Sequence, residues 1–491
     1  MTRERKLLFD AGLLFFFGVI ASFLGYLIRM ILSRQLTLEE FGLFYSVFTF
    51  VGFFIVFRDA GLSISLMKFI PEFLVNDQPS RIKASIKFIF IVNFIFSLIL
   101  ILILILFSDY LSKNYFGSDL AKPLLFLLST YFLFYSLYRV FMNIFVGFQK
   151  SKYYSWDLLF INLVVLLGIL IFSEMGIFSP AIAYIFAAFL GVFISIIVFL
   201  KLFKYFRYKS DYSSRLKTRL FHYGFPLLLA AIGFVVIGQI DVMMLTGFRT
   251  LSEVGIYSVV LPTAMLLVTL GSSMAQVILP YVSEYWAKKK YSQISKVINE
   301  TYRKAFVFIV PAGLILFVFS DIVLRFLFGE EFILGINALK ILSVGAILFS
   351  VATINNSILS AIGRPKLVTK IILSVTFLNV ILNLILIPFY GIVGAAIATS
   401  ISYLLVLYLS SKWVSKIVGV KIPVFSWLKS FFSGLVFVGV VAILKKVIEV
   451  NIIFESFLVL FIGLLVYLGV IFSLKVISPK EFFSLFNGIK K

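Results

Sequence analysis

Hydrophobic residues occur in long, nearly uninterrupted runs, separated by short polar segments that are rich in Lys and Arg. A helix needs about 20 apolar residues to cross the hydrocarbon core of a bilayer. The runs do not alternate as barrel strands do, and a helix satisfies its own backbone hydrogen bonds in lipid, so the pattern predicts transmembrane helices. Fourteen runs qualify, at about residues 11–33, 41–66, 84–107, 122–147, 155–174, 180–203, 219–247, 255–281, 304–328, 335–361, 366–388, 391–411, 424–445 and 452–475.

Composition places the chain outside the range of soluble proteins. Hydrophobic residues make up 62% of it and charged residues 13%, against about a quarter charged in a typical soluble domain. The mean hydropathy is +1.11. The four tryptophans fall near the ends of apolar runs, where an interfacial aromatic belt is expected. We therefore predict an all-α polytopic protein of the cell membrane.

The basic residues predict the orientation. With the N-terminus in the cytoplasm, the inner loops and termini receive 33 of the 44 Lys and Arg residues, which is the asymmetry of the positive-inside rule. Both termini are then cytoplasmic, and the start of the chain is an uncleaved first helix. The net charge of +22 is spread over short loops, so it reports topology and does not indicate a nucleic-acid partner.

An internal repeat is the main organising feature. Its segments recur in the same order at an offset of 213 or 215 residues, and each opens or closes an apolar run. The matched pairs are Thr37–Val47 with Thr250–Val259, Asn143 with Asn356, and Gly176–Ala183 with Gly391–Ala398.

Spans one to six thus correspond to spans seven to twelve. An even number of spans per repeat gives both copies the same orientation, as in transporters with parallel repeats. The expected organisation is an N-terminal six-helix lobe at 1–215, a second lobe at 216–415 and two additional spans at 416–491. Substrate sites in such proteins lie between the repeats. Glu39, Glu40 and Glu253, at the start of each copy, are expected to cap helices.

Charged residues inside the spans are candidates for a substrate site, because an ionisable group in hydrocarbon is costly. Arg29 and Asp241 lie at similar depths, toward the outer leaflet, in the first and seventh spans. They form either a pair at the outer end of a central cavity, with Arg29 binding an anion, or a snorkelling arginine and a helix-capping aspartate.

The adjacent Arg58 and Asp59 lie in the cytoplasmic third of the second span, just before a Gly-Leu-Ser segment. They mark either a broken helix that lines a cavity or an ordinary loop pair after a span that ends at Phe57. Gln239 and Gln276, on the seventh and eighth spans, are further cavity candidates. Asp157, at the start of the fifth span, is expected at the interface.

Several classes of chemistry are excluded. The chain has no cysteine and one histidine, His222, so disulfides, thiolate nucleophiles and histidine-ligated metal centres are not expected. No glycine-rich phosphate loop followed by Lys and Ser or Thr is found. We therefore predict a protein that is not an enzyme and has neither cofactor nor metal.

Short motifs along almost the whole chain resemble the polysaccharide transporter family. This family is the Wzx-type branch of the multidrug/oligosaccharidyl-lipid/polysaccharide (MOP) flippase superfamily. The motifs occur at Phe41–Phe44, Asp59–Ser63, Lys68–Glu72, Tyr223–Pro226, Gln239–Asp241, Val254–Ser258 and Gly391–Ala398.

The resemblance implies two six-helix lobes with two extra helices, and movement of a lipid-linked oligosaccharide from the inner to the outer leaflet. The cavity in that family is commonly cationic. Arg29 and Arg58 fit a polyprenyl diphosphate, with Asp59 and Asp241 as counter-charges or ion-coupling sites and Tyr257 as a further lining residue. Membrane lipids and a coupling ion are the other expected partners, and no oligomeric state is assigned.

Two alternatives remain. A cation-coupled exporter of multiple drugs or small molecules from the same superfamily would favour an acidic cavity, against which the two arginines argue. A membrane-embedded glycosyltransferase or polysaccharide polymerase needs catalytic carboxylates on a sizeable loop, and the outer loops here are short and poor in them.

Overall fold

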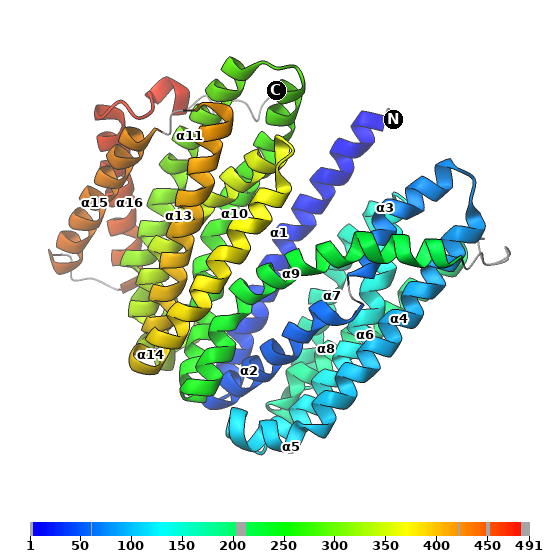
Figure 1. The fold of residues 1–491 in the computed structure, drawn as a ribbon. Helices are drawn as coiled ribbons and strands as arrows, with labels where there is room; N and C mark the ends of the chain where they lie inside the picture. Colours follow the sequence, from blue (N-terminus) through cyan, green and yellow to red (C-terminus); the bar gives the residue numbers. More distant parts are fainter. Residues whose placement is uncertain (1–2, 60, 203–212, 421–422, 448–451, 483–491) are drawn as a thin grey trace. The chain divides into compact units, whose positions relative to one another are not determined.

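A computed structural model describes residues 3–59, 61–202, 213–420, 423–447 and 452–482. Every regular element in these ranges is helical (Figure 1). The prediction of an all-α polytopic membrane protein is confirmed.

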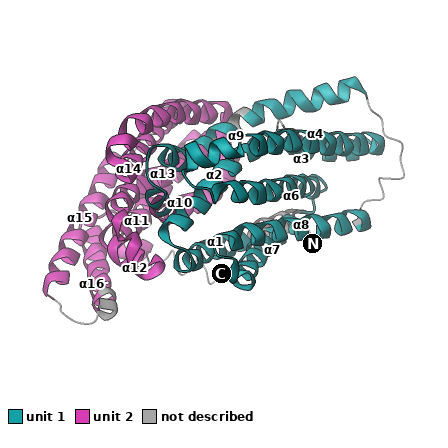
Figure 2. Ribbon diagram, turned by 90° about the horizontal axis from the view of Figure 1, so that it is seen from below, with its two compact units in different colours: residues 1–255 teal, residues 256–491 magenta. Residues whose placement is uncertain are grey.

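Contacts divide the chain into two compact units, residues 1–255 and 256–491 (Figure 2). Unit 1 contains α1 (Arg3–Gln35), α2 (Leu38–Phe54), η1 (Ile55–Phe57), α3 (Leu62–Val75), α4 (Pro79–Leu106), α5 (Ser108–Tyr110), η2 (Leu111–Phe116), α6 (Ala121–Gly147), α7 (Ser151–Ile171), η3 (Ser173–Met175), α8 (Phe178–Leu202), α9 (Ser214–Phe248) and the first residues of α10 (Leu251–Ala287). Unit 2 contains the rest of α10, then α11 (Tyr291–Val318), α12 (Ser320–Phe328), η5 (Glu330–Gly335), α13 (Ile336–Ala361), α14 (Pro365–Val418), α15 (Val424–Val447) and α16 (Ile452–Ser473).

The number of spans agrees with the sequence pattern. Eleven described helices are long and apolar enough to cross a membrane. We add α9, which is bent by 45° between Gly233 and Val235, and the apolar part of α16 at Phe457–Ser473. The 54-residue α14 contains two spans, because Gly391 has φ 55° and interrupts its helical backbone. The described chain therefore holds the fourteen expected spans.

Two expected spans are not continuous helices. The span at 41–66 is broken, because α2 and η1 end at Phe57 and α3 begins at Leu62. The span at 304–328 consists of α11 and α12, which meet at Phe319. Neither break is marked by a proline. The hydropathy pattern alone therefore predicts one span where the backbone forms two helices.

Unit 1 is held together by close approaches at small residues. A Cβ atom added to Gly168 of α7 would lie 2.8 Å from the Cβ of Ala183 in α8, and one added to Gly191 of α8 would lie 2.8 Å from the Tyr138 ring in α6. Small residues at helix contacts are typical of membrane proteins, because lipid provides no hydrophobic drive for helix association and packing must supply it.

The repeated segment makes a reciprocal contact inside unit 1. A Cβ on Gly42 would lie 1.8 Å from the carbonyl oxygen of Leu251, and a Cβ on Gly255 would lie 2.8 Å from the carbonyl oxygen of Leu38. Gly42 and Gly255 correspond under the 213-residue offset, and so do Leu38 and Leu251. Each copy thus places its glycine against the helix start of the other.

The same segments cap their helices as expected. Thr37 Oγ1 accepts from the backbone N–H of Glu40 at 3.3 Å, and the Glu40 carboxylate accepts from the N–H of Thr37 at 3.0 Å. In the second copy, Thr250 Oγ1 accepts from the N–H of Glu253 at 3.3 Å. The first copy forms a complete capping box, and the second shows the threonine contact, while its Glu253 carboxylate pairs with Arg249. Such contacts satisfy otherwise free N–H groups at a helix start.

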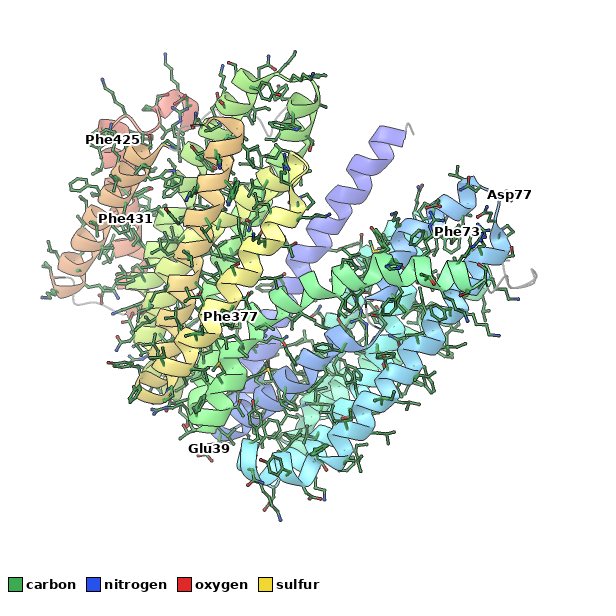
Figure 3. All side chains as sticks on the ribbon, viewed as in Figure 1. Glu39, Phe73, Asp77, Phe377, Phe425 and Phe431 are labelled. Atoms are coloured by element: carbon green, nitrogen blue, oxygen red, sulfur yellow. The ribbon has the colours of Figure 1, made fainter. Side chains whose placement is uncertain are left out.

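Unit 2 combines a buried polar network with an apolar exterior. The Tyr302 hydroxyl donates to Asn355 Oδ1 at 2.5 Å, and Asn355 Nδ2 donates to Ser410 Oγ at 3.0 Å. Outside, Phe377 and Phe425 are 70% and 71% exposed and project from their helices (Figure 3). Polar contacts inside and phenylalanines outside are the pattern expected of helices surrounded by lipid.

Candidate functional site

Arg29 of α1 is a half-buried cation inside a membrane-spanning helix. Its Nη1 donates a 3.4 Å hydrogen bond to the Gly25 carbonyl, and its Cζ lies 5.3 Å from the centre of the Tyr45 ring. Its Nε is buried and has no hydrogen-bond partner. In the part of the chain that the structure describes, Arg29 forms no ion pair with Asp241 or any other carboxylate. Such a cation is costly in hydrocarbon unless it faces water or an anionic ligand.

Four tyrosines from three helices form a chain of contacts that starts at this arginine. They are Tyr45 of α2, Tyr131 and Tyr135 of α6, and Tyr184 of α8. The ring centres of Tyr131 and Tyr135 are 5.3 Å apart, and those of Tyr131 and Tyr184 are 5.5 Å apart. Tyr45 and Tyr184 both lie within electrostatic range of the guanidinium. We call these five residues the arginine–tyrosine cluster.

Arg139 of α6 borders the cluster but has a fixed partner. Its Cζ lies 5.7 Å from the centre of the Tyr154 ring. The Tyr154 contact ties α6 to α7. Arg139 is therefore better suited to packing than to holding a ligand.

Arg58 lies in the break between η1 and α3. Its Nη1 donates a 2.9 Å hydrogen bond to the Ile55 carbonyl, while its Nε is buried without a partner. The neighbouring Asp59 offers it no compensation, because both carboxylate oxygens accept backbone N–H groups, from Gly61 and Ser63, at 3.0 Å each. Asp59 is 2% exposed. Its side chain thus caps α3.

The break is fixed by its surroundings in unit 1. Gly61 has φ 77°, which favours glycine, and a Cβ there would lie 2.4 Å from the carbonyl oxygen of Gly224 in α9. Asn143 of α6 donates to Ser63 Oγ at 3.0 Å. Further along, Arg219 of α9 forms a 2.7 Å ion pair with Glu72 of α3. Helices α6 and α9 therefore hold the turn that presents Arg58.

The other expected site residues are dispersed. Gln239 of α9 lies beside Gly52 of α2, where a Cβ would be 3.7 Å from its Nε2, and its Oε1 is buried without a partner. Asp241, two residues on, is 1% exposed. Within unit 2, Tyr257 is fully buried and Gln276 is exposed, both on α10.

Arg29 and Arg58 of unit 1 are thus guanidinium groups without a carboxylate partner among the described residues. Guanidinium groups bind phosphate oxygens through charge-assisted, often bidentate hydrogen bonds. Sequence reasoning selected both arginines but missed Tyr131, Tyr135 and Tyr184. The signal was present: Tyr131, Tyr135 and Tyr138 follow the i, i+4, i+7 spacing of one helix face.

Comparison with curated proteins finds relatives among membrane proteins and flippases. The chain is 28% identical to an uncharacterized membrane protein of Methanocaldococcus jannaschii over 88% of each chain. It is 33% identical to a probable low-salt glycan biosynthesis flippase of Haloferax volcanii, over 41% of this chain and 43% of that one. It is 29% identical to the lipid II flippase of Bacillus subtilis, over 28% of this chain and 26% of the relative.

Solved structures share the fold. A lipid II flippase in an inward closed conformation matches with a TM-score of 0.76 and 18% identity, over 93% of this chain and 98% of that one. An inward-facing MATE family transporter of the MOP superfamily matches with a TM-score of 0.70 and 15% identity, over 81% and 94%.

Two family models match the sequence. Residues 226–385 match the model described as MatE, and residues 7–286 match the model described as polysaccharide biosynthesis protein. The expected resemblance to MOP-superfamily polysaccharide transporters is confirmed. Because the second model covers more than half of the chain, this protein belongs to the polysaccharide biosynthesis protein family.

Proposed function

We propose that this protein is a flippase that moves a lipid-linked oligosaccharide of the polyprenyl diphosphate type across the cytoplasmic membrane. The glycan and diphosphate cross through a cavity by alternating access between the two repeats, while the lipid tail stays in the bilayer. No covalent step is involved.

One observation carries the proposal: Arg29 and Arg58 lack a carboxylate partner in the described structure. A diphosphate supplies the missing negative charge and several acceptor oxygens, which suits a guanidinium better than a cationic drug does. Tyr45 and Tyr184, which lie near Arg29, add hydroxyl groups that can hydrogen-bond phosphate or sugar oxygens. The names of the Haloferax volcanii and Bacillus subtilis relatives, a glycan biosynthesis flippase and a lipid II flippase, support the same substrate class.

The proposal is tested by complementation of a strain that lacks its own glycan flippase. The wild-type chain is expected to restore surface glycan. Arg29→Ala and Arg58→Ala are expected to lower it about tenfold or more, because a hydrogen bond to a charged group is worth about 1.5–3 kcal/mol. Arg29→Lys should retain part of the activity, since it keeps the charge but loses the planar fork.

Lys113→Ala is the matched control, because Lys113 is exposed in η2 and lies outside the cluster. Immunoblots of membranes normalise each variant to its amount. Failure of the wild-type chain to restore any tested glycan would reject the flippase function. Restoration by the wild type and by both alanine variants alike would keep the function and reject the arginine site.

A further inference from the structure

Asp157 of α7 is a buried acid that the proposed function does not use. It was expected at the membrane interface, and neighbouring helices leave the residue only 7% exposed. Its Oδ1 is buried without a hydrogen-bond partner, and its carboxylate forms neither an ion pair nor a hydrogen bond with any residue that the structure describes. Burying a carboxylate without compensation is expensive. The ionised form of Asp157 is therefore favoured only when a cation compensates its charge.

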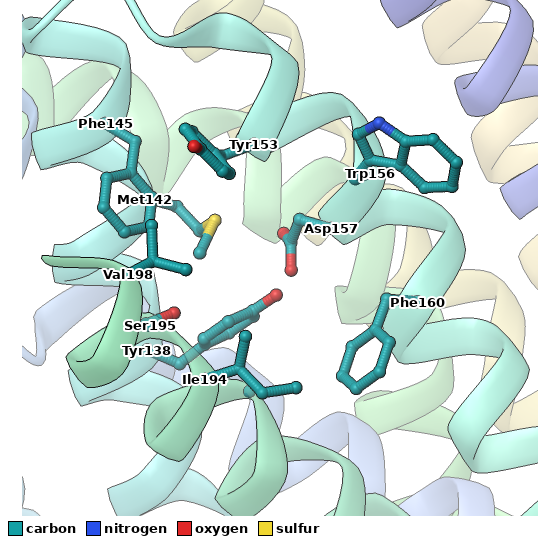
Figure 4. A pocket seen from close by; sticks show the side chains of 11 residues that line it. Tyr138, Met142, Phe145, Tyr153, Trp156, Asp157, Phe160, Ile194, Ser195 and Val198 are labelled. Atoms are coloured by element: carbon teal, nitrogen blue, oxygen red, sulfur yellow. The ribbon is translucent and has the colours of Figure 1, made fainter. Parts of the chain in front are cut away.

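The carboxylate points into a cavity between α6, α7 and α8 in unit 1 (Figure 4). The cavity has a volume of about 190 Å³, whereas one water needs about 10–15 Å³ on the same measure. It has room for a molecule of several non-hydrogen atoms. The hydroxyl of Tyr138 points toward the carboxylate, and Ser195 lies beside Tyr138 (Figure 4). Ser195 is 3% exposed.

Aromatic rings form much of the remaining wall. Tyr138, Phe145, Tyr153, Trp156 and Phe160 all line the cavity. The face of an aromatic ring attracts cations, and proteins recognise quaternary ammonium ions with cages of aromatic rings. The chemistry of the wall therefore matches the charge demand of Asp157.

Basic side chains do not compete for the carboxylate. None lines the cavity. The Lys152 ammonium lies 5.2 Å from the centre of the Tyr153 ring, and Arg139 is engaged with Tyr154. An anionic ligand would meet Asp157 with like charge. A bare metal cation would find few oxygen ligands on a wall made mostly of apolar and aromatic atoms.

We propose that the cavity of Asp157 binds a small organic ammonium ion, with the carboxylate as counter-ion and the surrounding rings as a cation-binding cage. The site is separate in its residues from the arginine–tyrosine cluster, and it does not depend on the proposed transport of a lipid-linked glycan.

Tetramethylammonium chloride is a suitable probe, titrated by calorimetry into the purified full-length protein with sodium chloride at equal ionic strength as reference. The wild type is expected to bind it saturably. Asp157→Asn, which keeps the shape and removes the charge, is expected to weaken binding at least tenfold. Asp119→Asn, the same change at an exposed acid, is expected to bind as the wild type does.

Tyr153→Leu provides a second variant that leaves the carboxylate in place, and it should weaken binding several-fold through loss of one ring face. Size-exclusion chromatography checks that each variant is folded and monodisperse. The proposal is overturned if the wild type does not bind tetramethylammonium, if sodium displaces it at equal concentration, or if folded Asp157→Asn and Tyr153→Leu both bind it with unchanged affinity.

Discussion

Arg58 and Asp59 are neighbours in the chain but have opposite surroundings. Each carboxylate oxygen of Asp59 accepts one backbone N–H group, whereas Arg58 keeps a buried Nε without a partner. Asp59 therefore stabilises the turn, and Arg58 remains available to bind a ligand. A sequence motif of two adjacent charges does not reveal this division of roles.

Replacing Asp59 by alanine is expected to destabilise the protein through loss of the α3 cap. Removing a capping side chain costs about 0.5–2 kcal/mol, and two buried N–H groups lose their acceptor here. Asp59→Asn keeps one acceptor oxygen and should cost less. Thermal unfolding in detergent measures both changes. A folded Asp59→Asn variant of wild-type stability without complementing activity would instead assign the charge itself to transport or ion coupling.

At the level of single residues, the sequence identified candidate site residues where a residue type is rare among its neighbours in the chain. Arg29 stood out because charge is scarce in an apolar run. Tyr131 and Tyr184 did not, because aromatic residues are common throughout the chain and only the folded helices bring these two rings together. The burial of Asp157 was not predicted, since its position near a helix start does not tell whether neighbouring helices cover it.

At the level of helices, hydropathy located the spans but not their breaks. The interruption at Gly391 was placed correctly, between spans 366–388 and 391–411, because a glycine and the repeat both mark it. The break at Phe319 was missed, although Ser320 and Asp321 directly after it interrupt the apolar run. Where the backbone changes direction inside a span depends on how the helices pack. The pattern of hydrophobic residues along the sequence does not contain this information.

The reciprocal glycine contact predicts a steep penalty for one added methyl group. Gly42→Ala would place Cβ 1.8 Å from the carbonyl oxygen of Leu251, so backbone must move, and overpacking of this kind costs about 1–3 kcal/mol. Gly238→Ala in α9 is the matched control, because no atom lies within 4 Å of its added Cβ. Thermal unfolding should show a lower midpoint for Gly42→Ala and an unchanged or higher one for Gly238→Ala. Equal midpoints would contradict the close contact.

The contact between the segment after α16 and helix α11 is expected to stabilise the protein in a pH-dependent way. Glu481 accepts from the backbone N–H of Ser478 at 3.0 Å and from Arg303 of α11 at 2.9 Å. The Ser478 N–H, together with Arg303, lowers the pKa of Glu481 below its ordinary value of 4.5. A lowered folded pKa means that the contribution to stability is complete above pH 4.5 and is lost as the pH falls through the folded value.

Glu481→Gln should therefore lower the unfolding midpoint relative to wild type at pH 6 to 7, and the difference should shrink toward zero below the lowered pKa. Glu331→Gln changes an exposed acid of the same unit and should leave the midpoint unchanged across the range. A Glu481→Gln effect that is constant with pH would show that the ionised carboxylate is not what holds the segment.

For the whole molecule, the distribution of basic residues predicts which side of the membrane each loop faces. The positions of the helices allow this prediction to be tested by labelling two loops. The chain contains no cysteine, so each introduced cysteine is a unique label site. Asn114→Cys lies before α6 and Ser292→Cys lies after α10, and both positions are exposed. The spans α6, α7, α8, α9 and α10 separate them, and an odd number of spans places the two sites on opposite sides of the membrane.

With cytoplasmic termini, a membrane-impermeant maleimide should label Asn114→Cys in intact cells and Ser292→Cys only after permeabilisation. The wild-type chain controls for background labelling. The reverse pattern would invert the orientation and the positive-inside argument with it. Labelling of both sites from one side would mean that one of the five helices does not cross the membrane. The bent α9 is the first to test, because its two halves pass as a span only when taken together.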